Sequence, residues 1–258
     1  MHDWNLECGA VLTDAGLWQR SWYFPRERET LSESYVREAS TVRRAVGMCD
    51  VTSLGKIAVQ GPDSAAFLDS VYSNAMAKLA VGRVRYGIML RDDGIVMDDG
   101  TVWRESEDEF LLTTTTTNAG KVMTFLEELL QVRWPHLRVH VTSVTDRWAG
   151  FSLAGPLSRE TLQACLADGV RVSDANCPFM SFIDTRLNSA VPCRIARISF
   201  SGELAYEIYV ASGYGAHLAE LLASNVTARG GCQYGLEALG TLRIEKGHVT
   251  GAELDGRV

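Results

Sequence analysis

The sequence has 258 residues, of which 46% are hydrophobic and 22% are charged, values typical of a globular chain with a full core. Its formal net charge of −7 argues against a surface that neutralises the phosphates of nucleic acid or of an anionic membrane. No segment approaches the roughly 20 consecutive apolar residues of a membrane span, and the first residues do not resemble a signal peptide. The composition therefore favours a cytoplasmic protein with no nucleic-acid or membrane partner.

The cysteines are widely spaced, without any CxxC pair, and no HExxH motif is present. This spacing disfavours a disulfide framework and a zinc site, so we expect free, mostly buried thiols and no bound metal. The glycines match neither GxGxxG nor GxxxxGK[ST], which leaves a dinucleotide fold and a P-loop without support. The cysteines are Cys8, Cys49, Cys165, Cys177, Cys193 and Cys232.

The first element with a clear pattern covers residues 57–68. An apolar strand from Ile57 leads into a turn at Gly61-Pro62, and an amphipathic helix follows. Proline after the glycine suits a turn, and Ser64 stands where a helix N-cap is expected. The pattern predicts a strand, a tight turn and a capped helix.

A hairpin is predicted next, from residues 83–90 and 95–103 on either side of Asp92-Asp93-Gly94. Asp-Gly between two apolar runs is a strong short-range signal for a hairpin. The period of two in a strand predicts which residues of the second strand share a face. One face receives Ile95, Met97, Asp99, Thr101 and Trp103, and the other receives Val96, Asp98, Gly100 and Val102.

A run of five threonines, Thr113 to Thr117, continues an apolar stretch and predicts a strand because threonine is β-branched. Asn118 is a suitable N-cap for a helix over residues 121–130, whose apolar positions follow helical spacing.

Residues 151–162 repeat the plan of residues 57–68, with Gly155-Pro156 as the turn and Ser158 at the N-cap position. The repetition predicts a duplicated α+β architecture with antiparallel sheets. We expect two domains, a first α+β repeat over residues 1–145, which contains the Asp99 hairpin, and a second over residues 146–258.

The last third of the sequence predicts a further hairpin, with strands over residues 193–200 and 204–210. Helices are expected over residues 216–223 and 237–246, where the apolar positions again follow helical spacing.

Asp98 and Asp99 are the first candidates for chemistry. Adjacent residues of a strand point to opposite faces, so only one carboxylate looks into a given pocket, and we expect the other to be solvated or paired with an arginine. Asp99 shares its predicted face with Trp103, where a carboxylate could orient an amine and move a proton. The residue pattern alone favours the alternative, that Asp98-Asp99-Gly100 merely borders a bulge or a turn.

The segment Val42–Gly55, VRRAVGMCDVTSLG, resembles a stretch of the aminomethyltransferase family, which includes the T-protein of the glycine cleavage system. Further motifs follow in the order of that family, so the resemblance covers essentially the whole chain. They are Gly61-Pro62, Asn74, Tyr86, the GIVMDD segment Gly94–Asp99, Gly155-Pro156, Gly202-Glu203 and Arg243–Glu245.

Within the family, the sequence looks closest to the C-terminal half of sarcosine oxidase α subunits. The segments that carry this likeness are Val51–Asp63, Lys78–Gly100, Val139–Gly150, Arg197–Ile208 and Arg243–Arg257. The resemblance implies the folate-binding fold of the family, with a tetrahydrofolate site at the centre of a ring of α+β subdomains. It also implies other sarcosine oxidase subunits or domains as partners, which would carry the flavin and NAD.

The resemblance assigns roles to residues that match the family's motifs. Asp99 matches the catalytic aspartate, which positions folate and stabilises a cationic iminium as the one-carbon unit is transferred. Tyr86 matches an aromatic residue of the folate site, and Glu207 matches the glutamate that binds the amino group of the pterin. Trp103 and Phe200 stand where the family commonly carries tyrosine, so stacking is retained without the hydroxyl contacts.

Other positions depart from the family pattern. Thr115 aligns with an asparagine of the folate site, and Leu239 aligns with an arginine that binds the folate tail. Loss of that arginine removes a charge-assisted contact. His248 lies near a further aromatic position. Family members also continue into a small C-terminal β-barrel, which has no counterpart in this sequence.

The predicted function is therefore tetrahydrofolate-dependent one-carbon transfer within a sarcosine-oxidase-like enzyme. The implied partners are folate and an iminium or formaldehyde derived from an oxidised N-methyl amine, and the implied product is 5,10-methylenetetrahydrofolate. Two alternatives are a folate-binding module without transfer activity and a structural subunit domain. Relatives that maintain iron–sulfur proteins carry a KGCxxGQE-like signature, whereas Lys246-Gly247 is followed here by His248.

Overall fold

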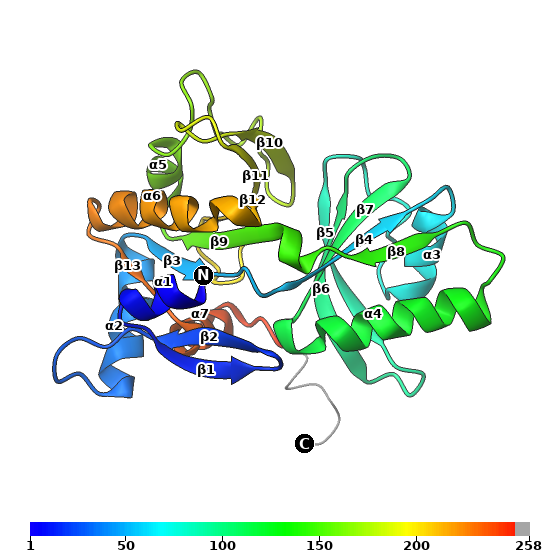
Figure 1. Ribbon diagram of the computed structural model, residues 1–258, viewed down its shortest axis with the longest axis horizontal. Helices are drawn as coiled ribbons and strands as arrows, with labels where there is room; N and C mark the ends of the chain where they lie inside the picture. Colours follow the sequence, from blue (N-terminus) through cyan, green and yellow to red (C-terminus); the bar gives the residue numbers. More distant parts are fainter. Residues whose placement is uncertain (251–258) are drawn as a thin grey trace. The chain divides into compact units, whose positions relative to one another are not determined.

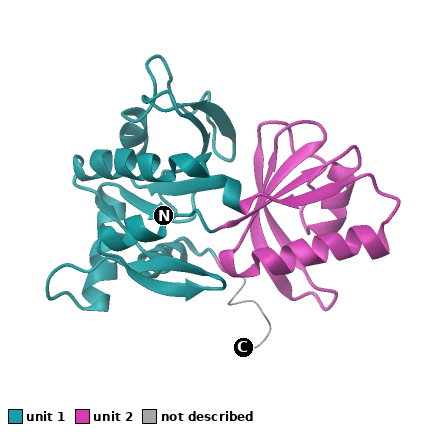
Figure 2. Cartoon of the chain, viewed as in Figure 1, with its two compact units in different colours: residues 1–53, 146–248 teal, residues 54–145, 249–258 magenta. Residues whose placement is uncertain are grey.

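A computed structural model describes residues 1–250 of the chain and forms two compact units (Figure 2). Unit 1 comprises Met1–Ser53 and Asp146–His248, and unit 2 comprises Leu54–Thr145 with the described residues after His248. None of the helices in the described part is long and apolar enough to cross a membrane. The last residues of the Arg243–Arg257 motif, from 251 on, lie outside the described residues.

Unit 2 is built around a five-stranded antiparallel sheet in the order β5-β6-β7-β4-β8 (Figure 1). Helices α3 and α4 bury apolar side chains such as Phe67 and Leu126 against one face of this sheet, because that face carries the apolar residues of every central strand. The elements in chain order are β4 (Gly55–Gln60), α3 (Ser64–Val71), β5 (Val84–Leu90), β6 (Val96–Arg104), β7 (Glu109–Thr114), η1 (Thr116–Asn118), α4 (Ala119–Glu128), η2 (Leu129–Arg133) and β8 (His140–Ser143).

Unit 1 contains a six-stranded sheet in the order β10-β11-β12-β9-β3-β13, in which only the β13–β3 pair is parallel. Its first elements are α1 (His2–Glu7), β1 (Val11–Ala15), β2 (Trp18–Tyr23), α2 (Leu31–Arg44) and β3 (Gly47–Asp50); β1 and β2 form a separate hairpin. After η3 (Thr145–Arg147) follow β9 (Trp148–Ala154), α5 (Ser158–Gln163), β10 (Phe182–Arg186), β11 (Pro192–Ala196), β12 (Ala205–Ala211), η4 (Ser212–Tyr214), α6 (Gly215–Thr227), β13 (Cys232–Gln233) and α7 (Leu236–Lys246).

The two units repeat one order of elements: a strand, a helix, a three-stranded meander, a short 3₁₀ turn, a second helix and a last strand. The sequence begins this order at β4 in unit 2 and at β9 in unit 1. The predicted duplicated α+β architecture with antiparallel sheets is therefore confirmed. The compact units divide after residues 53 and 145, and residues 1–53 group with residues 146–248.

The Gly-Pro turns show why the repeated pattern exists. Gly61 and Gly155 have φ angles of +132° and +128°. A Cβ at Gly61 would lie 2.1 Å from the carbonyl oxygen of Arg138, and one at Gly155 would lie 2.5 Å from that of Ala45. Only glycine tolerates both this backbone conformation and this close approach. The two glycines therefore let a neighbouring chain segment pass directly over the end of the strand.

Ser64 and Ser158 are not N-caps, contrary to the prediction. Each is the first residue of its helix and is fully buried. The Ser64 hydroxyl donates to the carbonyl of Asp108 at 3.1 Å, and the Ser158 hydroxyl donates to that of Leu204 at 2.8 Å. The pattern was correct in position, but the serine ties the helix to a neighbouring segment instead of satisfying the helix's own N–H groups.

The remaining predicted elements are present with modified bounds. The predicted hairpin of residues 83–103 corresponds to β5 and β6, with Gly94 at a φ of +82° in the turn. The threonine run ends its strand at Thr114 and continues as a 3₁₀ turn. None of the six cysteines forms a disulfide, and four of them are buried, which confirms the prediction of free, mostly buried thiols.

Candidate active site

A hydrogen-bonded pair, Tyr86 and Asp99, lies on the face of the unit 2 sheet that α3 and α4 leave uncovered. In the antiparallel register, Tyr86 of β5 lies opposite Thr101 of β6, and Ile88 lies opposite Asp99. Tyr86 and Asp99 are therefore diagonal neighbours on one face. The Tyr86 hydroxyl donates to Oδ2 of Asp99 at 2.8 Å.

The second carboxylate oxygen of Asp99, Oδ1, is buried and accepts no hydrogen bond within residues 1–250. A buried acceptor without a donor loses its hydration without compensation, at a cost of about 1–3 kcal/mol. Native proteins retain few such atoms, and those that remain often mark functional sites. Asp99 thus presents one fixed oxygen and one oxygen that lacks a donor.

The environment of Tyr86 keeps its hydroxyl protonated. Burial raises the pKa of Tyr86 well above its usual value, and the negative charge of Asp99 raises it further. A phenol in this state is a hydrogen-bond donor at neutral pH. Tyr86 therefore fixes the orientation of the Asp99 carboxylate without competing for its charge.

Asp98 is buried, with 1% of its surface exposed, so the expectation that it is solvated or paired with an arginine is wrong. Its Oδ1 accepts from the Thr115 hydroxyl at 2.6 Å and from the Asn118 amide at 3.1 Å. Burial raises the pKa of Asp98 to about 6, although these hydrogen bonds act in the opposite direction. Strand alternation correctly predicts that the two aspartates lie on opposite faces of the sheet. It does not predict which of the two faces is buried.

Trp103 and Thr115, both predicted to bind folate, use their polar atoms within the chain. The Trp103 ring is fully buried, and its Nε1 donates to the Thr101 hydroxyl at 2.7 Å. That hydroxyl lies 2.7 Å from the hydroxyl of Thr113 on the next strand. The Thr115 hydroxyl is the donor to Asp98 described above. These hydrogen bonds join β6, the strand that carries Asp99, to β7 and to the segment after it.

Glu207 and Phe200, the other predicted folate residues, belong to unit 1. The Tyr209 hydroxyl donates to Oε2 of Glu207 at 2.8 Å, and burial, followed by the charge of Glu207, raises the pKa of Tyr209 well above its usual value. Phe200 contacts the His248 ring edge to face, with 4.9 Å between ring centroids. Leu239, at the position of the missing arginine, packs against a hydrophobic cluster.

Sequence reasoning missed Asn118 as a residue of this region. It was predicted as an N-cap, but its side chain makes no capping hydrogen bond. The amide instead donates to the carbonyl of Met97 and to Asp98, both at 3.1 Å. Its place before a helix suggested the commoner role of asparagine, and no local signal pointed to a partner twenty residues earlier.

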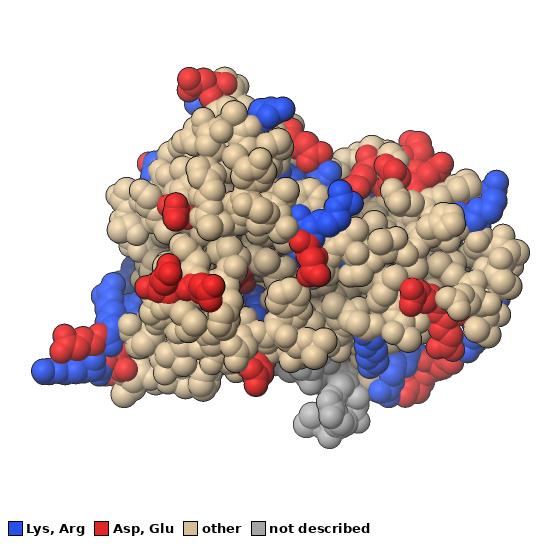
Figure 3. All heavy atoms as spheres, in the orientation of Figure 1, with Lys and Arg blue, Asp and Glu red and all other residues tan. Residues whose placement is uncertain are grey.

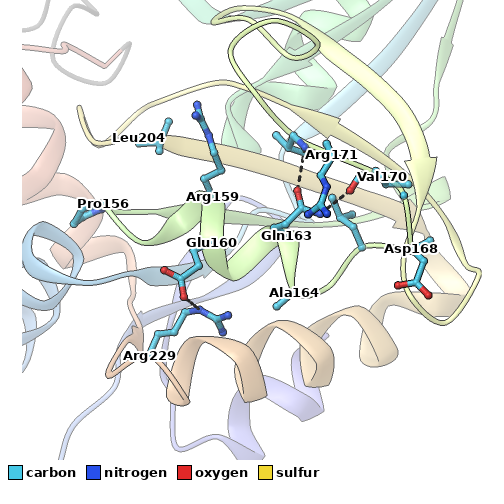
Figure 4. Close-up of a pocket in the computed structure, with 14 residues that line it drawn as sticks. Pro156, Arg159, Glu160, Gln163, Ala164, Asp168, Val170, Arg171, Leu204 and Arg229 are labelled. Carbon is cyan, nitrogen blue, oxygen red and sulfur yellow. Dashed lines mark hydrogen bonds and ion pairs between the residues drawn. The ribbon is translucent and has the colours of Figure 1, made fainter.

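A separate hollow of about 730 Å³ lies in unit 1 between α5 and the loop after it (Figure 4). It contains none of the predicted site residues. Its charged side chains are largely paired, since Arg229 bonds Glu160 at 3.2 Å and Arg159 bonds Asp174. Gln163 holds the loop by accepting from the Val172 N–H at 3.1 Å. On the face of the molecule in Figure 3, acidic and basic side chains are likewise interspersed.

Comparisons with known proteins agree on one family. Residues 1–258 match the family described as the GCVT N-terminal domain. Sarcosine oxidase subunit alpha of Rhizobium meliloti (strain 1021) is 48% identical over 260 residues, and that of Corynebacterium sp. (strain P-1) is 46% identical over 259. Both matches cover 100% of this chain but only 26% and 27% of those proteins, so the chain spans about a quarter of their length.

More distant relatives carry the name aminomethyltransferase. The protein of Listeria welshimeri is 33% identical over 208 residues, which are 81% of this chain and 54% of that protein. The crystal structure of the glycine cleavage system aminomethyltransferase T from Bartonella henselae matches with a TM-score of 0.78. That match covers 96% of this chain and 62% of the other, with 23% sequence identity. At this identity, the likeness establishes the fold.

Proposed function

The chain belongs to the GCVT N-terminal domain family of aminomethyltransferases and sarcosine oxidase α subunits, and from that premise we propose that it is a tetrahydrofolate-dependent one-carbon transfer module. The resemblance inferred from the motifs is thereby confirmed. In this proposal an oxidised N-methyl amine delivers an iminium or formaldehyde, whose carbon forms bonds to two folate nitrogens. The product is 5,10-methylenetetrahydrofolate, and the demethylated amine leaves from the iminium, or water from formaldehyde. A bound reduced folate supplies the amine nitrogens that accept the one-carbon unit.

The buried, unpartnered Oδ1 of Asp99 is the observation that carries this proposal. An amine N–H or a cationic iminium supplies the donor or positive charge that this oxygen lacks. This unsatisfied acceptor therefore fits a reduced folate, whose nitrogens carry N–H donors. A neutral apolar ligand would leave the same atom unsatisfied, which argues against a purely hydrophobic occupant.

Asp99 and Tyr86 have different roles in this proposal. Tyr86 holds Oδ2, which leaves Oδ1 as the oxygen free to accept from a ligand. Asp99 can then orient an amine, stabilise developing positive charge and accept a proton from nitrogen as the new bond to carbon forms. Since its position is fixed before the ligand arrives, little reorganisation accompanies the step.

Glu207 and Phe200, which lie in unit 1, are assigned the roles that the resemblance implies. We assign Glu207 to the amino edge of the pterin, because a carboxylate pairs in a bidentate manner with a guanidine-like group. Tyr209 fixes the orientation of that carboxylate. Phe200, with His248 against it, offers an aromatic surface for stacking.

Trp103 and Thr115 act in this proposal mainly by supporting the strands around Asp99. Trp103 is fully buried, and the polar atoms of Trp103 and Thr115 are engaged with Thr101 and Asp98, so we assign neither side chain a direct contact with folate. Leu239 supplies no cation for the folate tail, which predicts weaker binding than in relatives with arginine there.

The chain spans only about a quarter of the length of its sarcosine oxidase relatives, so we infer that other subunits or domains oxidise the amine. We propose that further sarcosine oxidase subunits or domains carry flavin and NAD and produce the one-carbon unit. Asp99 would then act after the amine has been oxidised, in the transfer of the one-carbon unit to folate. We place this enzyme in the cytoplasm. This division makes the chain part of an enzyme, whether or not it is active alone.

Calorimetric titration of the 258-residue chain with tetrahydrofolate tests the proposal. Saturable heat is expected, reduced by Glu207→Gln and left unchanged by Glu27→Gln, the same substitution at a side chain that is 88% exposed. Absence of heat would contradict the folate assignment for this chain. Unchanged binding with Glu207→Gln would show that Glu207 does not contact folate. The role of Asp99 would then still be tested by the transfer assay.

A further inference from the structure

Strand β6 contains a one-residue β-bulge directly before the aspartate pair. Met89 of β5 pairs with Asp98, but the next residue, Leu90, pairs with Val96. Met97 is therefore the extra residue, without a partner of its own. A bulge of this kind turns two successive side chains to one side of the sheet.

The burial of the side chains agrees with this geometry. Met97 and Asp98 are both buried, and Met97 belongs to the apolar cluster under α3 and α4. Asp99 follows on the opposite face, beside Tyr86. The expectation that Met97 and Asp99 share a face is thus wrong, because strict alternation is broken between them. A bulge does lie beside the pair, as the alternative interpretation expected.

The bulge decides which aspartate faces Tyr86. In a regular strand with Met97 kept in the core, Asp98 would point to the Tyr86 face and Asp99 would point into the core. Burial of Met97 is favourable by about 1.5–3 kcal/mol, so the core holds that residue in place. The extra residue therefore exchanges the faces of the two carboxylates.

The Asn118 side chain clamps this bulge. Its amide donates to the carbonyl of Met97 and to Oδ1 of Asp98, the two bulged residues, each at 3.1 Å. Thr115 adds its hydroxyl and its N–H to the Asp98 carboxylate. Asn118 directly precedes α4, whose Val122 and Leu126 are fully buried, so the clamp is attached to a packed element.

We propose that Asn118 is a positioning residue, which holds the β6 bulge and thereby presents Asp99, rather than Asp98, to Tyr86 and to the ligand. The catalytic part of this inference rests on the proposed function. The geometric part, that Asn118 holds the bulge, does not depend on it. A bulge leaves backbone groups without ladder partners, and the Asn118 amide satisfies the carbonyl of Met97. Without the Asn118 amide, β6 could also adopt the regular conformation that lacks the bulge.

Carbon-13 NMR of the chain labelled at the aspartate Cγ provides a readout that needs no folate. Asp98→Asn and Asp99→Asn assign the two carboxyl signals. In the wild type, Tyr86→Phe should shift the Asp99 signal more than the Asp98 signal. In the Asn118→Ala background, the larger response to Tyr86→Phe should move to Asp98.

Two further variants keep this test decisive. Asn118→Asp has the same size but presents an oxygen to the Met97 carbonyl and to Asp98, so it should give the same exchange even if the alanine variant does not fold. Asn225→Ala removes an asparagine that donates to the Leu221 carbonyl in unit 1, and it should leave both carboxyl signals unchanged. If Asp99 still gives the larger response in both Asn118 variants, the clamp does not set the face.

The transfer assay adds the catalytic consequence. Displacement of Asp99 should lower the turnover rate by up to ~100-fold, with a smaller change in the affinity for tetrahydrofolate. A wild-type chain that does not bind folate would contradict the proposed function and leave the NMR result standing. Wild-type transfer with unchanged turnover in the Asn118 variants would contradict the positioning role instead.

Discussion

Tyr86 and Asp99 lie on neighbouring antiparallel strands, and the Tyr86 hydroxyl donates to one oxygen of the Asp99 carboxylate at 2.8 Å. The other oxygen is buried and accepts nothing within the described chain. This asymmetry gives the carboxylate a fixed direction and one unsatisfied acceptor. It is the basis for the predictions on activity below.

Tyr86→Phe should weaken both stability and transfer. The substitution removes the donor to Oδ2 of Asp99 and leaves a partly buried charge less compensated, so the unfolding free energy should fall by about 1–3 kcal/mol. Urea denaturation measures this change, and the transfer rate should fall more than folate affinity. Tyr214→Phe, at an exposed tyrosine, should change stability by less than about 0.5 kcal/mol. Equal behaviour of the two variants would show that the Tyr86 hydroxyl is dispensable.

Asp98→Asn should change how stability depends on pH. The folded-state pKa of Asp98 is raised from 3.8 to about 6, so ionisation above pH 4 costs more in the folded state than in the unfolded state. The wild type should lose about 2 kcal/mol relative to the asparagine variant as pH rises from 4 to 7. Denaturation curves at several pH values measure this difference. A difference that does not vary with pH would mean that Asp98 does not titrate in this range.

The Gly-Pro turns predict a contrast among glycines. Gly61→Ala and Gly155→Ala each place a Cβ closer than 3 Å to a backbone oxygen at positive φ, so each should destabilise its unit by more than about 1 kcal/mol. Gly240→Ala, inside α7 where a Cβ meets nothing within 4 Å, should stabilise by up to about 1 kcal/mol. Thermal unfolding of the three variants tests this contrast, and a tolerated Gly155→Ala would contradict the close approach.

Much of the fold could be predicted because local signals agree with it. Asp-Gly between apolar runs specified the β5–β6 hairpin, and the repeated Gly-Pro pattern specified the duplication. The grouping of residues 1–53 with unit 1 could not be predicted, because β3 pairs with β9 about one hundred residues later. Pairings over such separations leave no short-range pattern.

The candidate site was predicted only at the level of single residues. The family motif selected Asp99, but alternation placed Met97 on the wrong face because a bulge has no distinct signature in an apolar strand. Asn118 and Ser64 were both interpreted as caps, the commoner role of such residues before a helix. Their actual partners, Met97 and Asp108, depend on tertiary packing.

The catalytic role of Asp99 is decided by the rate of 5,10-methylenetetrahydrofolate formation from formaldehyde and tetrahydrofolate, compared with the reaction without protein. The wild-type chain should accelerate the reaction. Asp99→Asn should reduce this acceleration by ~100-fold or more, the usual contribution of a general acid or base, while tetrahydrofolate binding changes far less. An Asp99→Asn chain that binds folate and matches the wild-type rate would contradict the assignment of Asp99 as the catalytic carboxylate.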